Sequence, residues 1–323
     1  MRKIEFREAI REAMQEEMRK DPLLYLMGYD VGEYGGEFRV SQGMFKEFGP
    51  RRVQDTPINE NGEIGLAVGA AITGCRAIVE IPFMDFMPMA MDAIVNQAAK
   101  FNYTFAGQRS VPIVIRTAMG GFIRAAEQHS QCFENWFVHV PGLKVVIPST
   151  GYDAKGLLKT AINDPNPVIF IEHKFMYPMK SEVPEEEYSI PFGSADIKKE
   201  GDQVTVIATS YMVHLSLNVA NKLEKEGISV EVVDPRSLVP LDEEKILSSV
   251  KKTGKVVIVH EAHKRGGWGG EMAAIIADQA FNYLDAPIKR VGAKDAPIPF
   301  PKVLEEHVLP SEADIEAAIR SVI

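Results

Sequence analysis

One carboxylate in an unusual setting is the first candidate for chemistry. Glu60 stands between two asparagines and directly precedes an apolar stretch in which Gly62, Gly65 and Gly69 recur. Small residues at this spacing predict a helix that another backbone can approach closely. A carboxylate buried beside such a helix keeps its charge only at a cost unless a partner donates a hydrogen bond, so it could exchange a proton. The alternative is a solvated turn glutamate that the helix dipole favours.

An imidazole and an aromatic ring are the next candidates. His129 lies within Gln128-His129-Ser130-Gln131, after an apolar run and a loop from Thr117 to Arg124. Imidazole exchanges protons near neutral pH, although a single histidine is more often structural than catalytic. Phe86 stands between Met84 and Met87, and either core packing or a stacking surface would suit it.

Two further motifs lack the spacing of known sites. In His260-Glu261-Ala262-His263 the histidines are three residues apart, whereas a zinc protease helix needs four. No G-x-G-x-x-G stretch follows a predicted strand, which argues against a nicotinamide site. The glycine run from Gly266 to Gly270 predicts a mobile surface loop after a strand.

Alternating strands and helices must position these residues. Apolar runs, several of them bounded by Gly or Pro, predict buried strands at 23–27, 77–81, 111–116, 145–147, 168–172, 204–208, 228–234, 256–260 and 288–291. Helices are predicted at 4–20, 89–105, 154–162, 214–226, 242–251 and 312–322. A stretch rich in Glu and Lys interrupts the alternation. We therefore expect an α/β protein of two doubly wound domains, residues 1–182 and 201–323, joined by a surface linker at 183–200.

Composition narrows the class of protein. The net charge of −9 argues against general nucleic-acid binding, which needs a basic face. The longest apolar stretch, 83–91, is broken by Asp85 and bounded by Asp92, which excludes a membrane span. The first residues have mixed charges and no signal peptide pattern. Cys75 and Cys132 are expected to be buried free thiols in a reducing cytoplasm.

The amino-acid sequences of several motifs resemble those of one family along nearly the whole chain. Asp55-Thr56-Pro57-Ile58-x-Glu60-x-Gly62 is similar to the thiamine-diphosphate site in beta subunits of the 2-oxo-acid dehydrogenases. The resemblance continues through these stretches: residues 27–32, 83–86, 96–100, 128–131, 139–146 and 234–241. It implies a thiamine-pyrimidine-binding domain followed by a transketolase C-terminal-like domain.

The resemblance assigns roles to the candidate residues. It implies that Glu60 activates the cofactor's aminopyrimidine, that Phe86 packs on that ring, and that His129 assists acyl transfer to lipoyl sulfur. Glu127, where relatives commonly have a small residue, and Thr117-Ala118-Met119, where they have a Gly-Pro-rich loop, depart from the family pattern near His129.

Metal ions and partners are implied in the same way. Asp164 and Asn166, with the carbonyl groups of Ile113 and Ala161, match a structural potassium loop, for which an ordinary Pro-rich turn is the alternative. The chain contains no Gly-Asp-Gly stretch, the motif that holds Mg²⁺ and the diphosphate in such enzymes. An alpha subunit is therefore expected to supply it, in an α2β2 heterotetramer that serves a lipoyl-bearing acyltransferase core.

The expected function is the beta subunit of a cytoplasmic 2-oxo-acid dehydrogenase that acts on pyruvate or a branched-chain 2-oxo acid. Acetoin cleavage, suggested by Phe170-Ile171-Glu172-His173-Lys174, is an alternative within the fold. A non-catalytic interaction protein of the same fold is an alternative of another class. A self-sufficient transketolase-like enzyme is disfavoured by the missing diphosphate motif.

Overall fold

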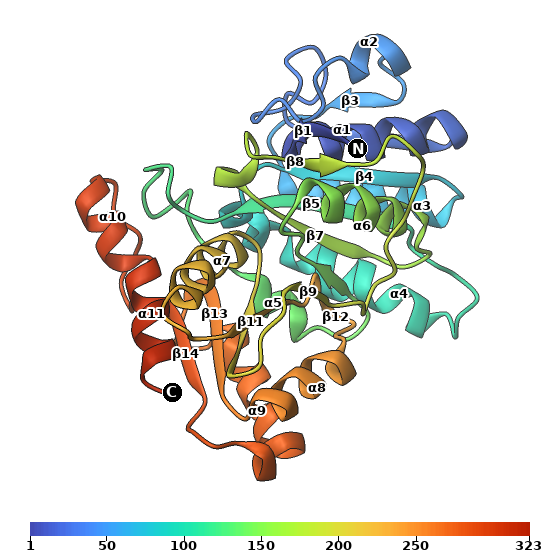
Figure 1. The fold of residues 1–323 in the computed structure, drawn as a ribbon. Coiled ribbons are helices and arrows are strands. Elements are labelled where there is room, and N and C mark those ends of the chain that lie inside the picture. Colours follow the sequence, from blue (N-terminus) through green and yellow to red (C-terminus); the bar gives the residue numbers. More distant parts are fainter. The chain divides into compact units, whose positions relative to one another are not determined.

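The computed structural model describes residues 1–323, which form two compact units (Figure 1). The first unit contains residues 1–119 and 136–192, and the second contains residues 120–135 and 193–323. The segment 120–135, which carries His129, thus groups with the second unit although the chain around it belongs to the first. A division of the sequence near residues 182 and 201 does not anticipate this grouping.

The first unit is built on a parallel sheet with helices between its strands. Its strands are β1 (Arg2–Glu5), β2 (Leu24–Gly28), β3 (Val53–Asp55), β4 (Arg76–Ile81), β5 (Ile113–Met119), β6 (Lys144–Val146), β7 (Val168–His173) and β8 (Lys180–Val183). Its helices are α1 (Phe6–Lys20), α2 (Met44–Phe48), α3 (Glu60–Ile72), α4 (Ala99–Thr104) and α6 (Gly151–Asn163). The short helical turns are η1 (Met84–Ala90), η2 (Asp92–Ala98) and η3 (Lys174–Met176), and α5 (Glu134–Val138) returns the chain to this unit.

The strand order of this sheet places α3 and α6 on opposite faces. Within the unit the order is β6-β7-β5-β4-β2-β3, and all neighbours are parallel. The connection β3–α3–β4 runs toward one edge and β6–α6–β7 toward the other, so right-handed crossovers put their helices on opposite sides. Each face is therefore covered, which explains why β5 and β7 are buried along their whole length. The doubly wound arrangement expected from the alternation is confirmed.

The expected surface linker, residues 183–200, is not a linker at its two ends, because Val183 and residues 196–199 belong to paired strands. β8 pairs antiparallel with β1, and β9 (Asp196–Lys199) joins the sheet of the second unit. The expected first helix likewise begins later, at Phe6, because residues 2–5 pair with β8. In both places a strand forms because it pairs with a segment distant in sequence, which local sequence patterns do not show.

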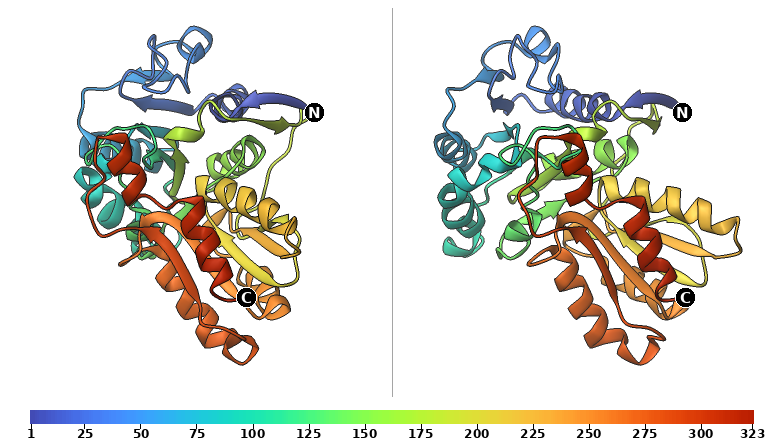
Figure 2. Two further views of the ribbon diagram at one scale, coloured as in Figure 1. Left: turned by 60° about the vertical axis from the view of Figure 1, so that its left-hand side comes forward. Right: turned by 90° about the vertical axis from the view of Figure 1, so that its left-hand side faces the viewer.

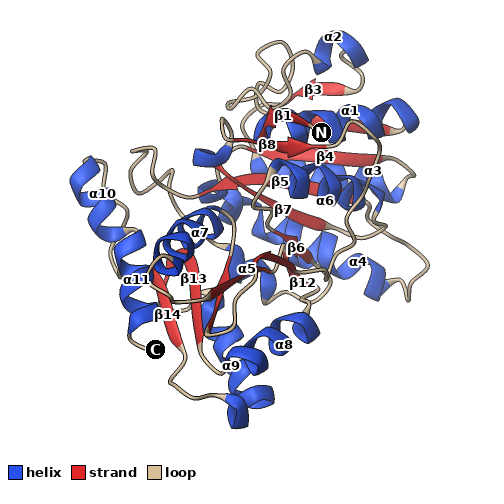
Figure 3. Cartoon of the chain, in the orientation of Figure 1, coloured by secondary structure: helices blue, strands red, loops and turns tan.

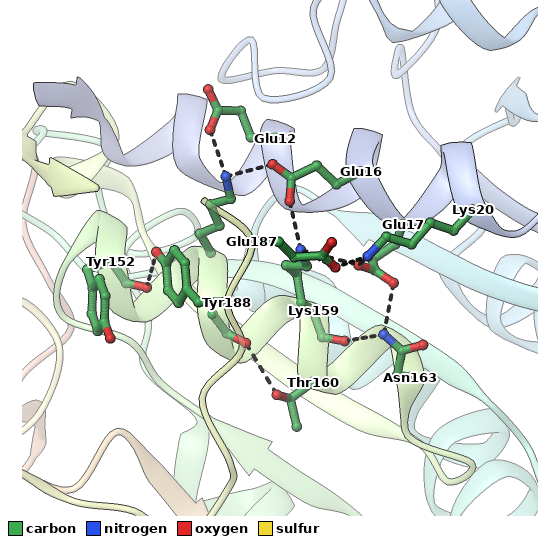
Figure 4. A network of polar contacts seen from close by, with 12 residues as sticks. Glu12, Glu16, Glu17, Lys20, Tyr152, Lys159, Thr160, Asn163, Glu187 and Tyr188 are labelled. Atoms are coloured by element: carbon green, nitrogen blue, oxygen red, sulfur yellow. Dashed lines mark hydrogen bonds and ion pairs between the residues drawn. The ribbon is translucent and has the colours of Figure 1, made fainter. Parts of the chain in front are cut away.

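An ion-pair network between α1 and α6 fixes the chain after β8 (Figure 4). Lys155 and Lys159 on α6 are buried: the Lys155 Nζ lies 2.7 Å from one Glu16 oxygen on α1, and the Lys159 Nζ lies 2.7 Å from the other. Figure 4 shows Lys159 pointing toward Glu16. Glu187 reaches Lys159 at 3.1 Å, and the Tyr188 ring stacks on Tyr152. Because an unpaired buried ammonium is costly, these carboxylates are required where they stand.

The second unit repeats the layered plan with a smaller sheet. Its strands are β9, β10 (Val204–Ala208), β11 (Val230–Asp234), β12 (Ser237–Val239), β13 (Val256–His263) and β14 (Lys289–Ala293). Its helices are α7 (Tyr211–Glu224), α8 (Glu243–Thr253), α9 (Trp268–Ala280), α10 (Lys302–Val308) and α11 (Glu312–Arg320), with the turn η4 (Phe281–Tyr283). Figure 3 distinguishes the helices from the strands.

The sheet of the second unit has the order β14-β13-β10-β11-β9 and is parallel except for β9. α7 packs with α11, which runs to the C-terminus in Figure 2, and α8 packs with α9. Buried valines from β10, β11 and β13 form the core with Ile315 and Ile319 of α11. Residues 268–270 of the glycine run expected to be a loop form the start of α9, where Trp268 is buried, so that expectation was wrong for them; Gly266 and Gly267 lie in the turn before the helix.

Two findings concern the whole chain. None of its helices is both long enough and apolar enough to cross a membrane. Cys75 and Cys132 are free but partly exposed, so the expectation that they are buried was wrong.

Candidate functional site

Glu60 is the first residue of α3 and lies at the carboxyl edge of the first sheet. Asn59 caps the helix, because its side chain accepts a hydrogen bond of 2.9 Å from the Gly62 backbone N–H. Glu60 is only 8% exposed. The solvated turn glutamate considered from the sequence is therefore wrong. No Lys or Arg forms an ion pair with this carboxylate.

A second carboxylate and a phenol stand beside Glu60, and the sequence analysis missed both. Glu63 follows one helical turn later and is 3% exposed; the Thr56 hydroxyl donates to one of its oxygens, and the other has no hydrogen-bond partner. Burial raises the pKa of Glu63 to about 7, and the negative charge of Glu60 adds to this effect although the Thr56 bond opposes it. The i, i+3 spacing was the available sequence signal.

Tyr29, directly after β2, completes this cluster. Burial and then the charge of Glu63 raise its pKa, and Glu60 contributes as well. Its buried hydroxyl forms no hydrogen bond of normal geometry, so Glu60 is near it without a well-formed bond. The cluster thus holds two carboxyl groups and a phenol with no cation to balance them. Such surroundings favour the protonated form of Glu63.

We expect Glu63→Gln to stabilise the isolated chain at alkaline pH and not at acid pH. The raised pKa means that the stability linked to Glu63 is fully present below its unfolded pKa near 4.5 and is lost as the pH rises through about 7. An amide does not ionise, so the variant should gain about 2–3 kcal/mol over the parent at pH 8.5. Thermal unfolding at pH 4.5 and pH 8.5 measures this, and an equal offset at both values would contradict it.

Phe86 lies on η1 of the same unit, and η1 packs against α3. Its ring is half-buried and meets Phe83 edge to face at a centroid distance of 6.2 Å. Glu60 and Phe86 therefore come from adjacent elements, as a shared site requires. The long helix expected over 89–105 is instead a 3₁₀ turn, a π turn and the short helix α4.

His129 lies in the segment 120–135 of the second unit and is half-buried. Its backbone N–H donates to the Ala126 carbonyl at 3.3 Å. Thr117-Ala118-Met119, expected to be part of the preceding loop, belongs to β5 and is buried there. The loop therefore begins at Gly120.

The second half of this loop lines a hollow of about 480 Å³ within the second unit. Glu127, Gln128 and Gln131 line it together with His263 and Arg265. The charged Glu127 therefore faces a hollow, where the family pattern has a small residue.

The residues expected to bind potassium are held by other contacts. The backbone N–H groups of Asp164 and Asn166 donate to the Ala161 carbonyl at 3.2 Å and to the Asp164 carboxylate at 2.9 Å. The Lys144 ammonium forms an ion pair with the second Asp164 oxygen, and Ile113 begins β5. A potassium ion on Asp164 would have to share that carboxylate with Lys144. The potassium site stays a prediction.

A buried network occupies the motif that suggested acetoin. Arg116 on β5 binds Glu172 on β7 through two hydrogen bonds of 2.6 and 2.7 Å and also pairs with Glu80 on β4. The Tyr177 hydroxyl donates to Glu172 at 2.8 Å, and the Lys174 ammonium donates to the Ala118 carbonyl at 3.0 Å. Glu172 and Lys174 thus have structural contacts, and their motif gives no support to acetoin as substrate. The chain has no group of three or more His, Cys, Asp or Glu side chains arranged to hold a metal ion.

Two family models match the chain. The model described as "Transketolase, pyrimidine binding domain" matches residues 2–180, and "Transketolase, C-terminal domain" matches residues 193–315. A solved structure described as "Split gene transketolase, inactive beta4 tetramer" has a TM-score of 0.81 at 24% identity and covers 99% of this chain and 98% of that one. At that identity the structure supports the fold alone.

Three curated relatives match the chain over nearly their whole length. The chain is 49% identical to the "Pyruvate dehydrogenase E1 component subunit beta" of Rickettsia felis, covering 99% of this chain and 98% of that protein. It is 48% identical to the "Acetoin:2,6-dichlorophenolindophenol oxidoreductase subunit beta" of Bacillus subtilis, covering 96% and 94%. It is 45% identical to the "2-oxoisovalerate dehydrogenase subunit beta" of the same organism, covering 98% and 97%.

Proposed function

The chain belongs to the E1 beta subunits of the 2-oxo-acid dehydrogenases, and from this premise we propose that it forms the pyrimidine-binding half of a thiamine-diphosphate site. The proposed enzyme decarboxylates pyruvate or a branched-chain 2-oxo acid and passes the acyl group to lipoyl. Membership implies an alpha partner. An α2β2 assembly, Mg²⁺ on the alpha subunit and docking to a lipoyl-bearing acyltransferase core are parts of the proposal.

The observation that carries the proposal is the buried, unbalanced acid cluster at the start of α3. Thiamine diphosphate, when bound, supplies the carbon acid whose deprotonation begins the reaction. Glu60 would hold a proton on its carboxyl group and share it with a ring nitrogen of the pyrimidine, a role that suits a buried carboxyl group without an ion pair. The half-buried ring of Phe86 offers a packing surface from the adjacent element.

The face of α3 turned away from the buried side chains supports a partner subunit at this helix. A side chain added at Gly65 or Gly69 would meet no atom within 4 Å, so this face of α3 is open to another backbone. Leu66 on the same helix is 57% exposed and Ile58 before it is 79% exposed. Exposed apolar side chains next to an open helix face are typical of an interface that a partner covers.

The sequence identities to the relatives do not show which substrate the enzyme uses. The values of 49%, 48% and 45% for proteins named after pyruvate, acetoin and 2-oxoisovalerate are too similar to discriminate. Acetoin stays a second candidate because of the relative that bears its name. A substrate panel with the reconstituted alpha and beta subunits would separate the three, because a correct acyl pocket raises kcat/KM for one of them.

Two other expectations stay proposals. We propose a cytoplasmic location; rice relatives at 45% identity are named as mitochondrial. A non-catalytic interaction protein is disfavoured, since Glu60 and His129 are both retained. Cofactor binding by the reconstituted complex would decide against that alternative, and failure of the complex to bind would favour it.

We expect His129→Ala to impair acyl transfer to lipoyl more than decarboxylation. An imidazole near neutral pH can supply and remove the proton at the lipoyl sulfur, and general acid–base groups commonly contribute about 10²–10⁴-fold. Single-turnover decarboxylation and reductive acylation should be measured separately in the reconstituted enzyme. Equal loss in both steps would count against this division of roles.

A further inference from the structure

The loop that carries His129 has a strained backbone. Gly120, Phe122, Arg124 and Ala126 all have positive φ angles, of 94°, 65°, 57° and 62°. Three of these four residues have a side chain, and such conformations are costly unless the surroundings hold them. Alternation of left-handed residues also turns successive backbone N–H groups toward a common side, where they favour an anion. The loop therefore needs an anchor that accepts hydrogen bonds.

Two buried carboxylates of the second unit accept hydrogen bonds from this backbone. Glu261, near the end of β13, accepts from the Gly121 N–H at 2.6 Å, and its same oxygen lies 3.9 Å from the Cys132 Sγ. Glu305 on α10 accepts from the Arg124 N–H at 3.1 Å. Burial raises the pKa of Glu305, whereas the N–H groups of Arg124 and Phe122 oppose that shift by stabilising its charged form.

These contacts close the loop at its base and support it further along. The Gly120 N–H donates to the Gln131 carbonyl at 3.4 Å, and Glu261 contacts both ends of the loop, at Gly121 and Cys132. Phe122 packs against the small apolar cluster that includes Leu309 and meets the Tyr211 ring edge to face. His129 lies inside the segment closed in this way.

We propose that Glu261 and Glu305 are positioning residues for His129: their carboxylates hold the left-handed backbone of residues 120–126 and so fix the loop from which His129 acts. This proposal rests on the proposed function for the role of His129. It gives these two carboxylates of the second unit an indirect part in acyl transfer. Neither residue needs to touch substrate or cofactor.

The test compares Glu305→Ala with Glu305→Gln, which keeps an acceptor oxygen of the same reach. Glu306→Ala is the matched control, since Glu306 is exposed and pairs only with Lys302 in the same helix. Hydrogen exchange of the Arg124 amide in the isolated full chain measures how well Glu305 protects this N–H group, and it requires no catalysis. We expect Glu305→Ala to exchange about tenfold faster or more, Glu305→Gln to stay close to the parent, and the control to be unchanged. Parent-like protection in Glu305→Ala would overturn the proposal.

Kinetics of the enzyme reconstituted with an alpha subunit provide the second readout. Glu305→Ala should lower kcat for reductive acylation about tenfold or more with decarboxylation and lipoyl KM little changed, in the pattern of His129→Ala, and Glu305→Gln should restore it. If His129→Ala lowers kcat for reductive acylation and Glu305→Ala does not, the positioning role of Glu305 is overturned, and the proposed function of the chain still stands. Normal reductive acylation by His129→Ala would instead remove the assigned role of His129. The hydrogen-exchange experiment would still test whether Glu305 holds the loop backbone.

Discussion

Glu60→Gln is expected to abolish turnover of the reconstituted enzyme while the fold and the assembly stay intact. The substitution keeps the shape of the side chain and its place at the start of α3, where Asn59 provides the cap. It removes the proton that the carboxyl group would share with the pyrimidine. Loss of a general acid–base group commonly costs roughly 10²–10⁴-fold in rate.

Two comparisons make this result specific. Glu185→Gln changes an exposed carboxylate of the same unit and should leave kcat unchanged. Glu60→Asp keeps the acid on a shorter side chain and should retain part of the activity. Near-normal turnover by Glu60→Gln in the assembled enzyme would remove Glu60 from the mechanism.

The second large effect concerns the isolated chain, which we expect to show no decarboxylase activity and very weak affinity for thiamine diphosphate. Its sequence has no Gly-Asp-Gly stretch to hold Mg²⁺ and the diphosphate. Glu60 and Phe86 would contact only the pyrimidine end. The small area buried there cannot offset the cost of immobilising a charged, flexible ligand.

Much of the fold could be predicted because its signals are local. Parallel strands buried on both faces appear as short apolar runs, and β10 covers the predicted residues 204–208. No helix was predicted over Trp268–Ala280, and the start of this helix was taken for a loop because glycines usually predict loops. Here a side-chain carbon added at Gly269 would lie 2.7 Å from the His260 ring, so this glycine permits close packing within a helix. Composition alone cannot reveal such a neighbour.

The residues of the candidate site also differ in how far neighbouring sequence could predict them. The place of Glu60 at a helix start was predictable because the flanking asparagines and the glycine-rich helix are adjacent to it in sequence, whereas its assigned role comes from the family resemblance. Glu63 had a weaker local signal, the i, i+3 spacing. Glu261 and Glu305 had none, since they lie 140 and 181 residues from the loop positions that they bind. Only the folded second unit brings those carboxylates to the His129 loop.

Calorimetric titration with thiamine diphosphate and Mg²⁺ tests most directly the central claim that this chain is one half of a shared site. The chain alone should give no binding stronger than millimolar, and addition of an alpha subunit that carries Gly-Asp-Gly should produce micromolar or tighter binding together with turnover. With Glu60→Gln the same complex should remain assembled but inactive. Micromolar binding by the chain alone would contradict the account, because it would require a diphosphate site within this subunit.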